Sequence, residues 1–365
     1  MKTVFFCHSI YSDWNHGNAH FLRGVASELL ARGHKVTLFE PQNAWSLEHL
    51  IQDHGTEPME AFRRAYPELA AVSHRFDPET LNLHEALSDA DTVIVHEWNS
   101  PSLVQRIGQH RNSHHHYRLF FHDTHHRMVT NPTEMSRYDL RYYDGVLGFG
   151  KVIADLYLQR GLVPRAWTWH EAADITRFRP VADVEKNLDL VWVGNWGDEE
   201  RTRELEEFLL GPVEDMGLKT AVRGVRYPES GLRRLQEAGI RYQGWIANFR
   251  VPEVFAGARM TVHVPRRPYV KALPGIPTIR VFEALACGIP LVSAPWSDAE
   301  GLFCPGEDFL VARDRTETKK HLSFIMHHPD AAAAMATRGL QRIRERHTCA
   351  HRVSELLQIR DEVDR

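Results

Sequence analysis

The chain opens with an apolar run, an amphipathic segment and a second apolar run. Residues 3–10 are mostly apolar and predict a buried strand. In the segment that follows, Phe21, Val25 and Leu29 recur at helical spacing, so one face of a helix is apolar. Residues 35–39 then predict a second strand. A strand–helix–strand unit of this kind joins parallel strands by a right-handed crossover.

The same alternation of strand and helix continues through the chain. Residues 45–88 are predicted to be mostly helical and polar, and a helix is expected at residues 151–160. Further strands of the first half are expected at residues 91–95, 117–121, 145–148 and 166–169. A second series is expected at residues 188–193, 220–222, 240–242, 260–264, 291–293 and 309–311. Each half therefore predicts a doubly wound α/β sheet, and the two halves meet near residue 180.

Length and charge narrow the class of protein. A chain of 365 residues is too long for one ordinary core and suggests two domains. Its net charge of −4 and the lack of a basic stretch give no attraction to nucleic acid or to anionic membranes, so neither is an expected partner. The first apolar run is too short for a signal peptide or a membrane span, so we expect a cytoplasmic protein with no transmembrane segment. The four cysteines are far apart and are expected to be reduced thiols.

The segment from Pro274 to Ser293 carries the clearest chemical signal. It predicts a Pro/Gly loop, a helix from about Thr278, a stop at Gly288 and a short buried strand. The free N–H groups at the start of that helix favour an anion. Glu283 lies about one and a half turns into the helix, and its carboxylate can accept hydrogen bonds from two vicinal hydroxyls.

Glu283 is followed by Ala-Leu-Ala-Cys-Gly-Ile-Pro, and this arrangement resembles the nucleotide-sugar site of GT-B glycosyltransferases of the group 1, family 4-like type. The resemblance is strongest to the branch with the CgeB-like spore-protein enzymes. It implies an α/β, GT-B fold with two Rossmann-like domains that face each other across a cleft. Residues 1–180 would form the acceptor domain and residues 181–345 the donor domain. The helix at 346–365 would cross back to the first domain or pack locally on the second, and the sequence leaves both open.

The resemblance implies how the second domain holds its donor. Glu283 would bind the ribose hydroxyls, while Arg280 and Lys271 would neutralise the diphosphate. Thr278 would cap the helix or bind phosphate. For Glu283 and Arg280 the ordinary alternative is a solvated helix face. The remaining residues expected at the donor nucleotide and diphosphate are Ile279, Gly194, Asn195, Arg201 and Arg223.

Gly275 departs from the pattern of the resembled family. Retaining members commonly carry a second Glu eight positions before the one matched by Glu283, beside the donor sugar. Here that position is Gly275, and the loop from Lys271 to Arg280 holds no acidic substitute. The departure leaves the donor sugar open, and it leaves reduced activity open as well.

Candidate residues of the first domain follow its strands. The resemblance places His122 against the donor sugar, and Asp123 would orient it or bind acceptor hydroxyls, so these two are the catalytic candidates. Further candidates for the acceptor and the cleft are His96, Glu97, Trp98, Gly17 and Asn18, the last two having an ordinary turn and helix cap as their alternative. We expect no metal at the histidines of residues 122–126 or 114–116. Strand neighbours point to opposite faces, and we expect no helical His-x-x-x-His pair.

Together these features predict a glycosyltransferase of the hexosyltransferase type (EC 2.4). It would move a sugar from a nucleoside-diphosphate sugar to an acceptor hydroxyl, with retention and without a metal. The resemblance implies no cofactor besides the donor, and the acceptor is not indicated. Two alternatives stay open: a nucleotide-sugar epimerase of the same fold, and a catalytically reduced binding or structural protein of an envelope or spore coat.

Overall fold

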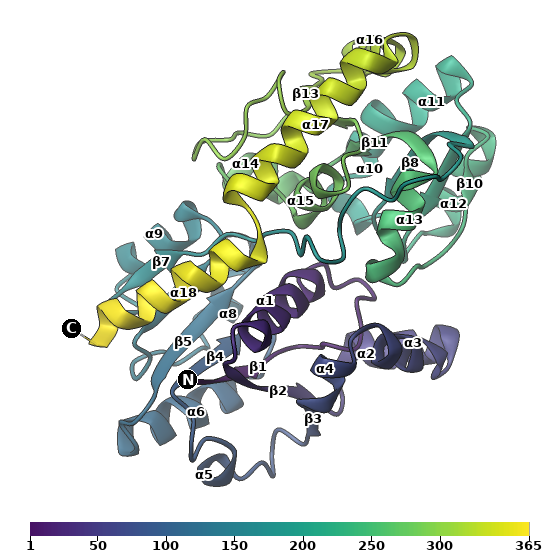
Figure 1. Cartoon of the computed structure of the whole chain (residues 1–365). Helices are drawn as coiled ribbons and strands as arrows, with labels where there is room; N and C mark the ends of the chain where they lie inside the picture. Colours follow the sequence, from purple (N-terminus) through teal and green to yellow (C-terminus); the bar gives the residue numbers. More distant parts are fainter. Residues whose placement is uncertain (365) are drawn as a thin grey trace. The chain divides into compact units, whose positions relative to one another are not determined.

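The structure, a computed structural model, describes residues 1–364 and divides into two compact units (Figure 1). The first unit comprises residues 1–171 and the C-terminal segment that begins at Cys349. The second unit runs from Ala172 to Thr348. The chain thus leaves the first unit ahead of residue 180 and returns to it for its last helix.

The first unit is built on a parallel sheet of seven strands with the order β3-β2-β1-β4-β5-β6-β7. This is the doubly wound order in which the chain reverses direction next to the first strand. The edge strand β3 was not predicted, because its sequence Ser-His-Arg-Phe has no apolar alternation and only Phe76 is buried. The strands are β1 (Lys2–Phe6), β2 (Lys35–Pro41), β3 (Ser73–Phe76), β4 (Thr92–His96), β5 (Arg118–Asp123), β6 (Gly145–Gly148) and β7 (Ala166–Thr168).

Helices cover both faces of this sheet. The apolar stripe predicted for the first of them is confirmed, since Phe21, Val25 and Leu29 are buried. The helices of the first unit before the crossover are α1 (Ala19–Ala31), α2 (Trp45–His54), α3 (Glu57–Ala65), α4 (Pro67–Ala71), α5 (Leu83–Ala86), α6 (Pro101–Ser113), α7 (Arg127–Thr130), α8 (Pro132–Met135) and α9 (Lys151–Gln159).

The C-terminal helix α18 (Cys349–Asp364) packs against α1, the yellow and purple helices of Figure 1. Its buried face carries Val353, Leu356 and Ile359. The Trp169 indole N–H donates to the carbonyl of Arg352 at 2.9 Å. Of the two placements that the sequence leaves open, the structure has this helix on the first unit.

The second unit repeats the architecture with a parallel sheet of six strands in the order β10-β9-β8-β11-β12-β13. Its core includes Trp192, Leu205, Met260 and Val262. The strands are β8 (Leu188–Val193), β9 (Thr220–Arg223), β10 (Arg241–Tyr242), β11 (Ala258–His263), β12 (Leu291–Ser293) and β13 (Leu310–Val311).

The segment after residue 197 is divided into several short helical pieces. A 3₁₀ turn is followed by one α-helical turn, a π-helical turn and a second α-helical piece, before Gly217 ends the run in a left-handed conformation. The helical segments of this unit are η1 (Asp198–Glu200), α10 (Thr202–Leu205), η2 (Glu206–Leu210), α11 (Gly211–Met216), α12 (Glu229–Glu237), η3 (Asn248–Arg250), α13 (Val251–Ala256), α14 (Arg267–Ala272), α15 (Ile279–Ala286), α16 (Arg315–His327) and α17 (Pro329–Arg346). Within residues 1–364, no helix has both the length and the apolar content to cross a membrane.

Candidate functional site

The predicted loop–helix–strand of the second unit is present as α15 and β12. Glu283 is fully buried, which rules out the solvated helix face as its environment. Its Oε1 accepts a hydrogen bond from Asn248 Nδ2 at 2.6 Å, and its Oε2 pairs with Arg280 one turn earlier. The carboxylate therefore fixes the guanidinium of Arg280 at the start of α15.

A hydrogen-bonded chain holds Thr278 at the same helix start. Ser293 Oγ donates to the carbonyl of Ala294, so it accepts from His263 Nδ1 at 2.8 Å. That leaves His263 Nε2 to accept the hydroxyl proton of Thr278 at 3.0 Å. Thr278 occupies the N-cap position, but its side chain makes no capping hydrogen bond. The helix start therefore offers the backbone N–H groups of its first turn, which include those of Ile279 and Arg280, as donors to an anion.

Three guanidinium groups surround this helix start. Burial lowers the pKa of Arg201, and the nearby Arg266 and Arg280 lower it further. Burial, followed by Arg201 and Arg280, lowers the pKa of His263 to about 3. Arg280 is paired with Glu283 and Arg266 with Glu200, so these two cations are partly neutralised, and an anion near Arg201 would stabilise its charged form.

The turn after β8 is tied to the same group of residues. Arg201 donates to the carbonyl of Val264 at 2.9 Å, to the carbonyl of Asn195 and to the carbonyl of Trp196 at 3.3 Å. Asn195 Oδ1 in turn accepts from the N–H of Val225 at 3.0 Å. Gly194 is needed there, since a Cβ would lie 2.6 Å from the Trp192 ring. Arg201 is therefore the cation that connects the turn after β8 to the end of β11.

Two of the predicted donor residues lie apart from this cluster. Lys271 is exposed on α14, and its resolved electrostatic effect falls on Glu204. Arg223 donates to the carbonyl of Gln243 at 3.0 Å, and its pKa is lowered by burial and by Arg250. The structure therefore joins Arg201, rather than these two, to the start of α15.

The structure explains why glycine occupies position 275. Its φ of +91° lies in the region that favours glycine, and its N–H donates to the carbonyl of Ser297 at 2.7 Å. A Cβ at this position would lie 2.8 Å from Cγ and Oε1 of Glu300. The loop from Lys271 to Arg280 has no acid of its own, but a carboxylate from the loop after β12 occupies the space over Gly275. Sequence reasoning missed Glu300, because no spacing rule connects it to Gly275.

In the first unit, the ends of β4 and β5 bring the predicted residues together. His96 and His122 are paired in register, and their ring centroids are 5.5 Å apart. His122 is fully buried against the Trp169 ring at 4.9 Å, and neither ring nitrogen has a hydrogen-bond partner within residues 1–364. Burial lowers the pKa of His122 to about 3, so the imidazole is neutral at pH 7.

Asp123 does not bond to the ring of His122 but points away from it, as strand alternation requires. Its Oδ1 accepts from the N–H of His125 at 3.0 Å, and its Oδ2 accepts from the Tyr157 hydroxyl at 2.8 Å. Burial raises the pKa of Asp123 to about 6. The expectation that Asp123 orients His122 by direct contact is therefore not met.

Glu97 is the centre of a second buried network. It is paired with Arg127, and its Oε1 accepts from the backbone N–H and the hydroxyl of Thr124, both at 3.3 Å. His96 Nδ1 accepts from the Trp98 N–H at 3.4 Å, which leaves Nε2–H to donate to Thr124 at 3.1 Å. Burial and Asp123 raise the pKa of Glu97, and Arg127 opposes that rise.

Trp98 lies beside this network, with the guanidinium carbon of Arg127 4.0 Å from its ring centroid. Gly17 is exposed, and Asn18 is at the N-cap position of α1 without a side-chain capping bond. Instead Asn18 Nδ2 donates to Glu171 at 3.4 Å, while its buried Oδ1 has no partner within the described residues. Asn18 is thus a polar group held near the strand ends rather than a helix cap.

Comparison with known proteins adds the following. Residues 201–358 match the family model described as glycosyl transferase-like, and comparison with curated proteins finds no match. A sucrose-phosphate synthase from Thermosynechococcus elongatus has 14% identity and a TM-score of 0.67, covering 99% of this chain and 98% of that one. The Anabaena protein HepE in complex with UDP and glucose has 12% identity and a TM-score of 0.68, covering 99% of this chain and 100% of that one. An alpha-glucosyltransferase in complex with UDP-glucose and DNA containing an abasic site has 12% identity and a TM-score of 0.68, covering 99% of both chains.

The chain has the GT-B glycosyltransferase fold. The expected fold class is confirmed, as two α/β units with parallel sheets in the doubly wound order. The likeness to the CgeB-like branch is not confirmed by these relatives and stays a prediction. Within the GT-B fold, the loops after β8, β9, β11 and β12 are at the carboxyl ends of their strands, where ligands of open α/β sheets bind.

Proposed function

We propose that this protein is a glycosyltransferase that moves a sugar from a nucleoside-diphosphate sugar to an acceptor hydroxyl. The observation that carries the proposal is the group of cations near the first turn of α15: Glu283 holds Arg280 there, and burial, with the nearby charges of Arg266 and Arg280, lowers the pKa of Arg201. Guanidinium groups and helix N–H dipoles are what a diphosphate requires as it leaves. The match of residues 201–358 to the glycosyl transferase-like family and the GT-B fold support the same conclusion.

The reaction that we propose retains the anomeric configuration and uses no metal at the diphosphate. The guanidinium groups supply the positive charge that a divalent cation supplies elsewhere. The leaving diphosphate takes the proton of the acceptor hydroxyl, so no carboxylate nucleophile is required. The assignment of His122 to the donor sugar rests on the family resemblance, since its ring is fully buried, and its neutral imidazole would add no charge there. Retention itself rests on the family resemblance.

Glu300 is the carboxylate that we assign to the donor sugar. Its side chain occupies the space over Gly275, in the loop that leads into α15. A carboxylate there can accept hydrogen bonds from sugar hydroxyls. The alternative of a catalytically reduced protein rests on the acid that the loop lacks, and under this proposal Glu300 would supply that acid from a neighbouring loop.

In the first unit, the neutral His122 and the networks around Asp123 and Glu97 would hold the sugar and the acceptor. UDP is the first nucleotide to test, because several solved structures with this fold contain UDP or UDP-glucose. One of these proteins is an alpha-glucosyltransferase bound to DNA, whereas the net charge of −4 here leaves nucleic acid an unexpected acceptor.

The test is the release of nucleoside diphosphate from a panel of UDP-, GDP-, ADP-, CDP- and TDP-sugars, without acceptor. We expect one donor to be hydrolysed slowly. Glu300→Gln should lower that rate at least about tenfold, the loss of one charged hydrogen bond, with the affinity for free nucleoside diphosphate unchanged. Asp330→Asn, an exposed acid of the same unit, is the matched control.

The alternatives predict other results. Binding of a donor with no release by any preparation would favour a binding protein, and an epimerised sugar still attached to its nucleotide would favour the epimerase. If no nucleotide binds at all, the proposed function is wrong.

A further inference from the structure

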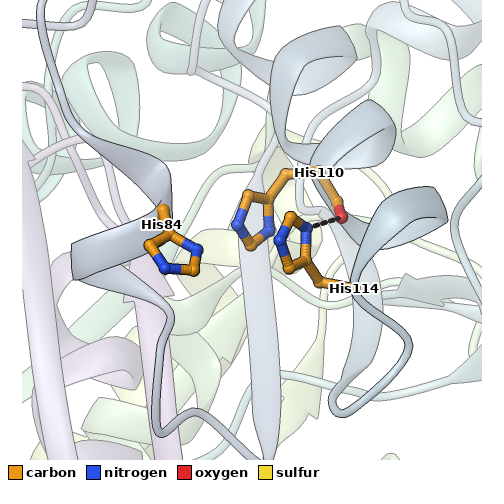
Figure 2. Close-up of side chains that lie close together, drawn as sticks. All are labelled: His84, His110 and His114. Atoms are coloured by element: carbon orange, nitrogen blue, oxygen red, sulfur yellow. Dashed lines mark hydrogen bonds between the residues drawn. The ribbon is translucent and has the colours of Figure 1, made fainter.

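Three histidines on the first unit gather away from the strand ends described above. His110 lies on the last turn of α6, His114 is the C-cap residue four positions later, and His84 comes from α5 (Figure 2). Each offers a ring nitrogen, and these three atoms lie within 4.8 Å of one another. His110 and His114 have His-x-x-x-His spacing, so the expectation that the chain holds no such pair is wrong.

The three rings lie close together. His110 and His114 are stacked with centroids 4.2 Å apart and an interplanar angle of 9°. The His84 ring centroid is 5.4 Å from that of His114 and 6.4 Å from that of His110. Because the lone pair of a ring nitrogen lies in the ring plane, the stacked rings must turn about their side-chain bonds before they can bind one ion. Ligands of a tetrahedral ion with Zn–N bonds of about 2.0–2.1 Å are roughly 3.4 Å apart, so the ring nitrogens must also move closer together.

Hydrogen bonds at Nδ1 leave the Nε2 atoms of His110 and His114 available as metal ligands. His114 Nδ1 donates to the carbonyl of His110 at 3.1 Å, the dashed line in Figure 2, so its Nε2 carries the lone pair. His110 Nδ1 is 3.0 Å from the Tyr117 hydroxyl, and its buried Nε2 has no partner within residues 1–364. A hydrogen bond at the other ring nitrogen is the usual support of a metal-bound histidine.

All three members of the group are histidines. Three imidazoles without a carboxylate suit Zn²⁺ and related transition ions, and not Mg²⁺ or Ca²⁺.

We propose that His84, His110 and His114 bind one Zn²⁺-class ion that ties α5 to the end of α6. Without the ion, α5 is a helix of four residues, and Arg106 connects the segment before it to α6 by bonding to the carbonyls of Pro78 and Leu81. The metal adds a second connection between the same two parts. The fourth position of the ion is open to water. This site is independent of the proposed transfer reaction.

The experiment is a titration of the chelator-treated, untagged full chain with Zn²⁺ by calorimetry, and with Co²⁺ by visible absorption. We expect one ion per chain, a tetrahedral Co²⁺ spectrum and no binding of Mg²⁺. Loss of a residue that only hydrogen-bonds to a metal ligand already lowers metal affinity about 10- to 100-fold. Removal of a ligand itself, in His84→Ala, His110→Ala or His114→Ala, should therefore lower the affinity at least about tenfold. His115→Ala, an exposed neighbour outside the cluster, should bind as the wild type does.

His84 is exposed, so His84→Ala decides the matter even if the other two variants fold poorly. The proposal is overturned if the wild type binds no Zn²⁺ below about 100 µM, or if His84→Ala binds Zn²⁺ as tightly as His115→Ala does.

Discussion

Gly275 has no side chain, and this leaves room for the side chain of Glu300. Its positive φ and the closeness of Glu300 both depend on the absence of a Cβ. The positive φ alone costs an L-residue about 1–2 kcal/mol. Gly275→Ala should therefore destabilise the second unit by at least that amount and displace Glu300, with the melting temperature as the measurement.

Gly257→Ala is the matched control. Gly257 has an ordinary negative φ, and a Cβ there would meet nothing closer than 3.7 Å. Equal melting temperatures for the two variants would contradict the packing described for Gly275.

Burial of His122 should make the stability of the first unit depend on pH. Its pKa is about 3 when folded and about 6.5 when unfolded, so the unfolded chain binds more protons between these values. The stability that depends on neutral His122 is complete above pH 6.5 and is lost as the pH falls. His122→Leu removes this effect, so the stability of the wild type relative to the variant should drop by about 2 kcal/mol between pH 7.5 and pH 5.

The measurement is urea unfolding followed by tryptophan fluorescence at both pH values. Trp169, which contacts the His122 ring, reports on this unit. A stability difference that does not change with pH would show that His122 is accessible to protons in the folded state.

At the scale of elements, α18 completes the first unit from the far end of the chain. Leu356 is 1% exposed on its buried face, whereas Gln358 is exposed. Leu356→Ala should cost about 2–5 kcal/mol, the usual range for a buried leucine. Gln358→Ala should stay within about 0.5 kcal/mol of the wild type. Thermal unfolding compares the two, and similar losses would mean that α18 is not part of the core of this unit.

How well the elements could be predicted depended on their apolar pattern. The interior strands and α1 were predictable because burial on a parallel sheet requires continuous apolar runs. The edge strand β3 was missed because three of its four side chains are not buried. The residues of the candidate sites also differed in how well they could be predicted. The start of α15 was predictable from local sequence, whereas Glu300 and His84 reach their partners only through the tertiary fold.

At the scale of the whole molecule, each unit has its own sheet and core, and each has its own chemistry. The cations and the helix start that suit a diphosphate all belong to the second unit. A nucleotide that binds only the folded form raises the stability of that unit, by about 2.7 kcal/mol at a concentration 100 times its Kd. Calorimetric scans with and without UDP should therefore show the effect on the transition that Gly275→Ala also shifts.

The most direct test of the account is isothermal titration of UDP, GDP, ADP, CDP and TDP into the wild type, Arg280→Ala and Arg313→Ala. Arg313 is an exposed arginine of the same unit that pairs with Glu317 on the surface. We predict that at least one nucleotide binds the wild type and Arg313→Ala equally, and that Arg280→Ala weakens it about 10- to 100-fold, the range of a charge-assisted hydrogen bond. Binding that is unchanged in Arg280→Ala, or absent from the wild type for all five nucleotides, would contradict the assignment of the α15 helix start as the nucleotide site.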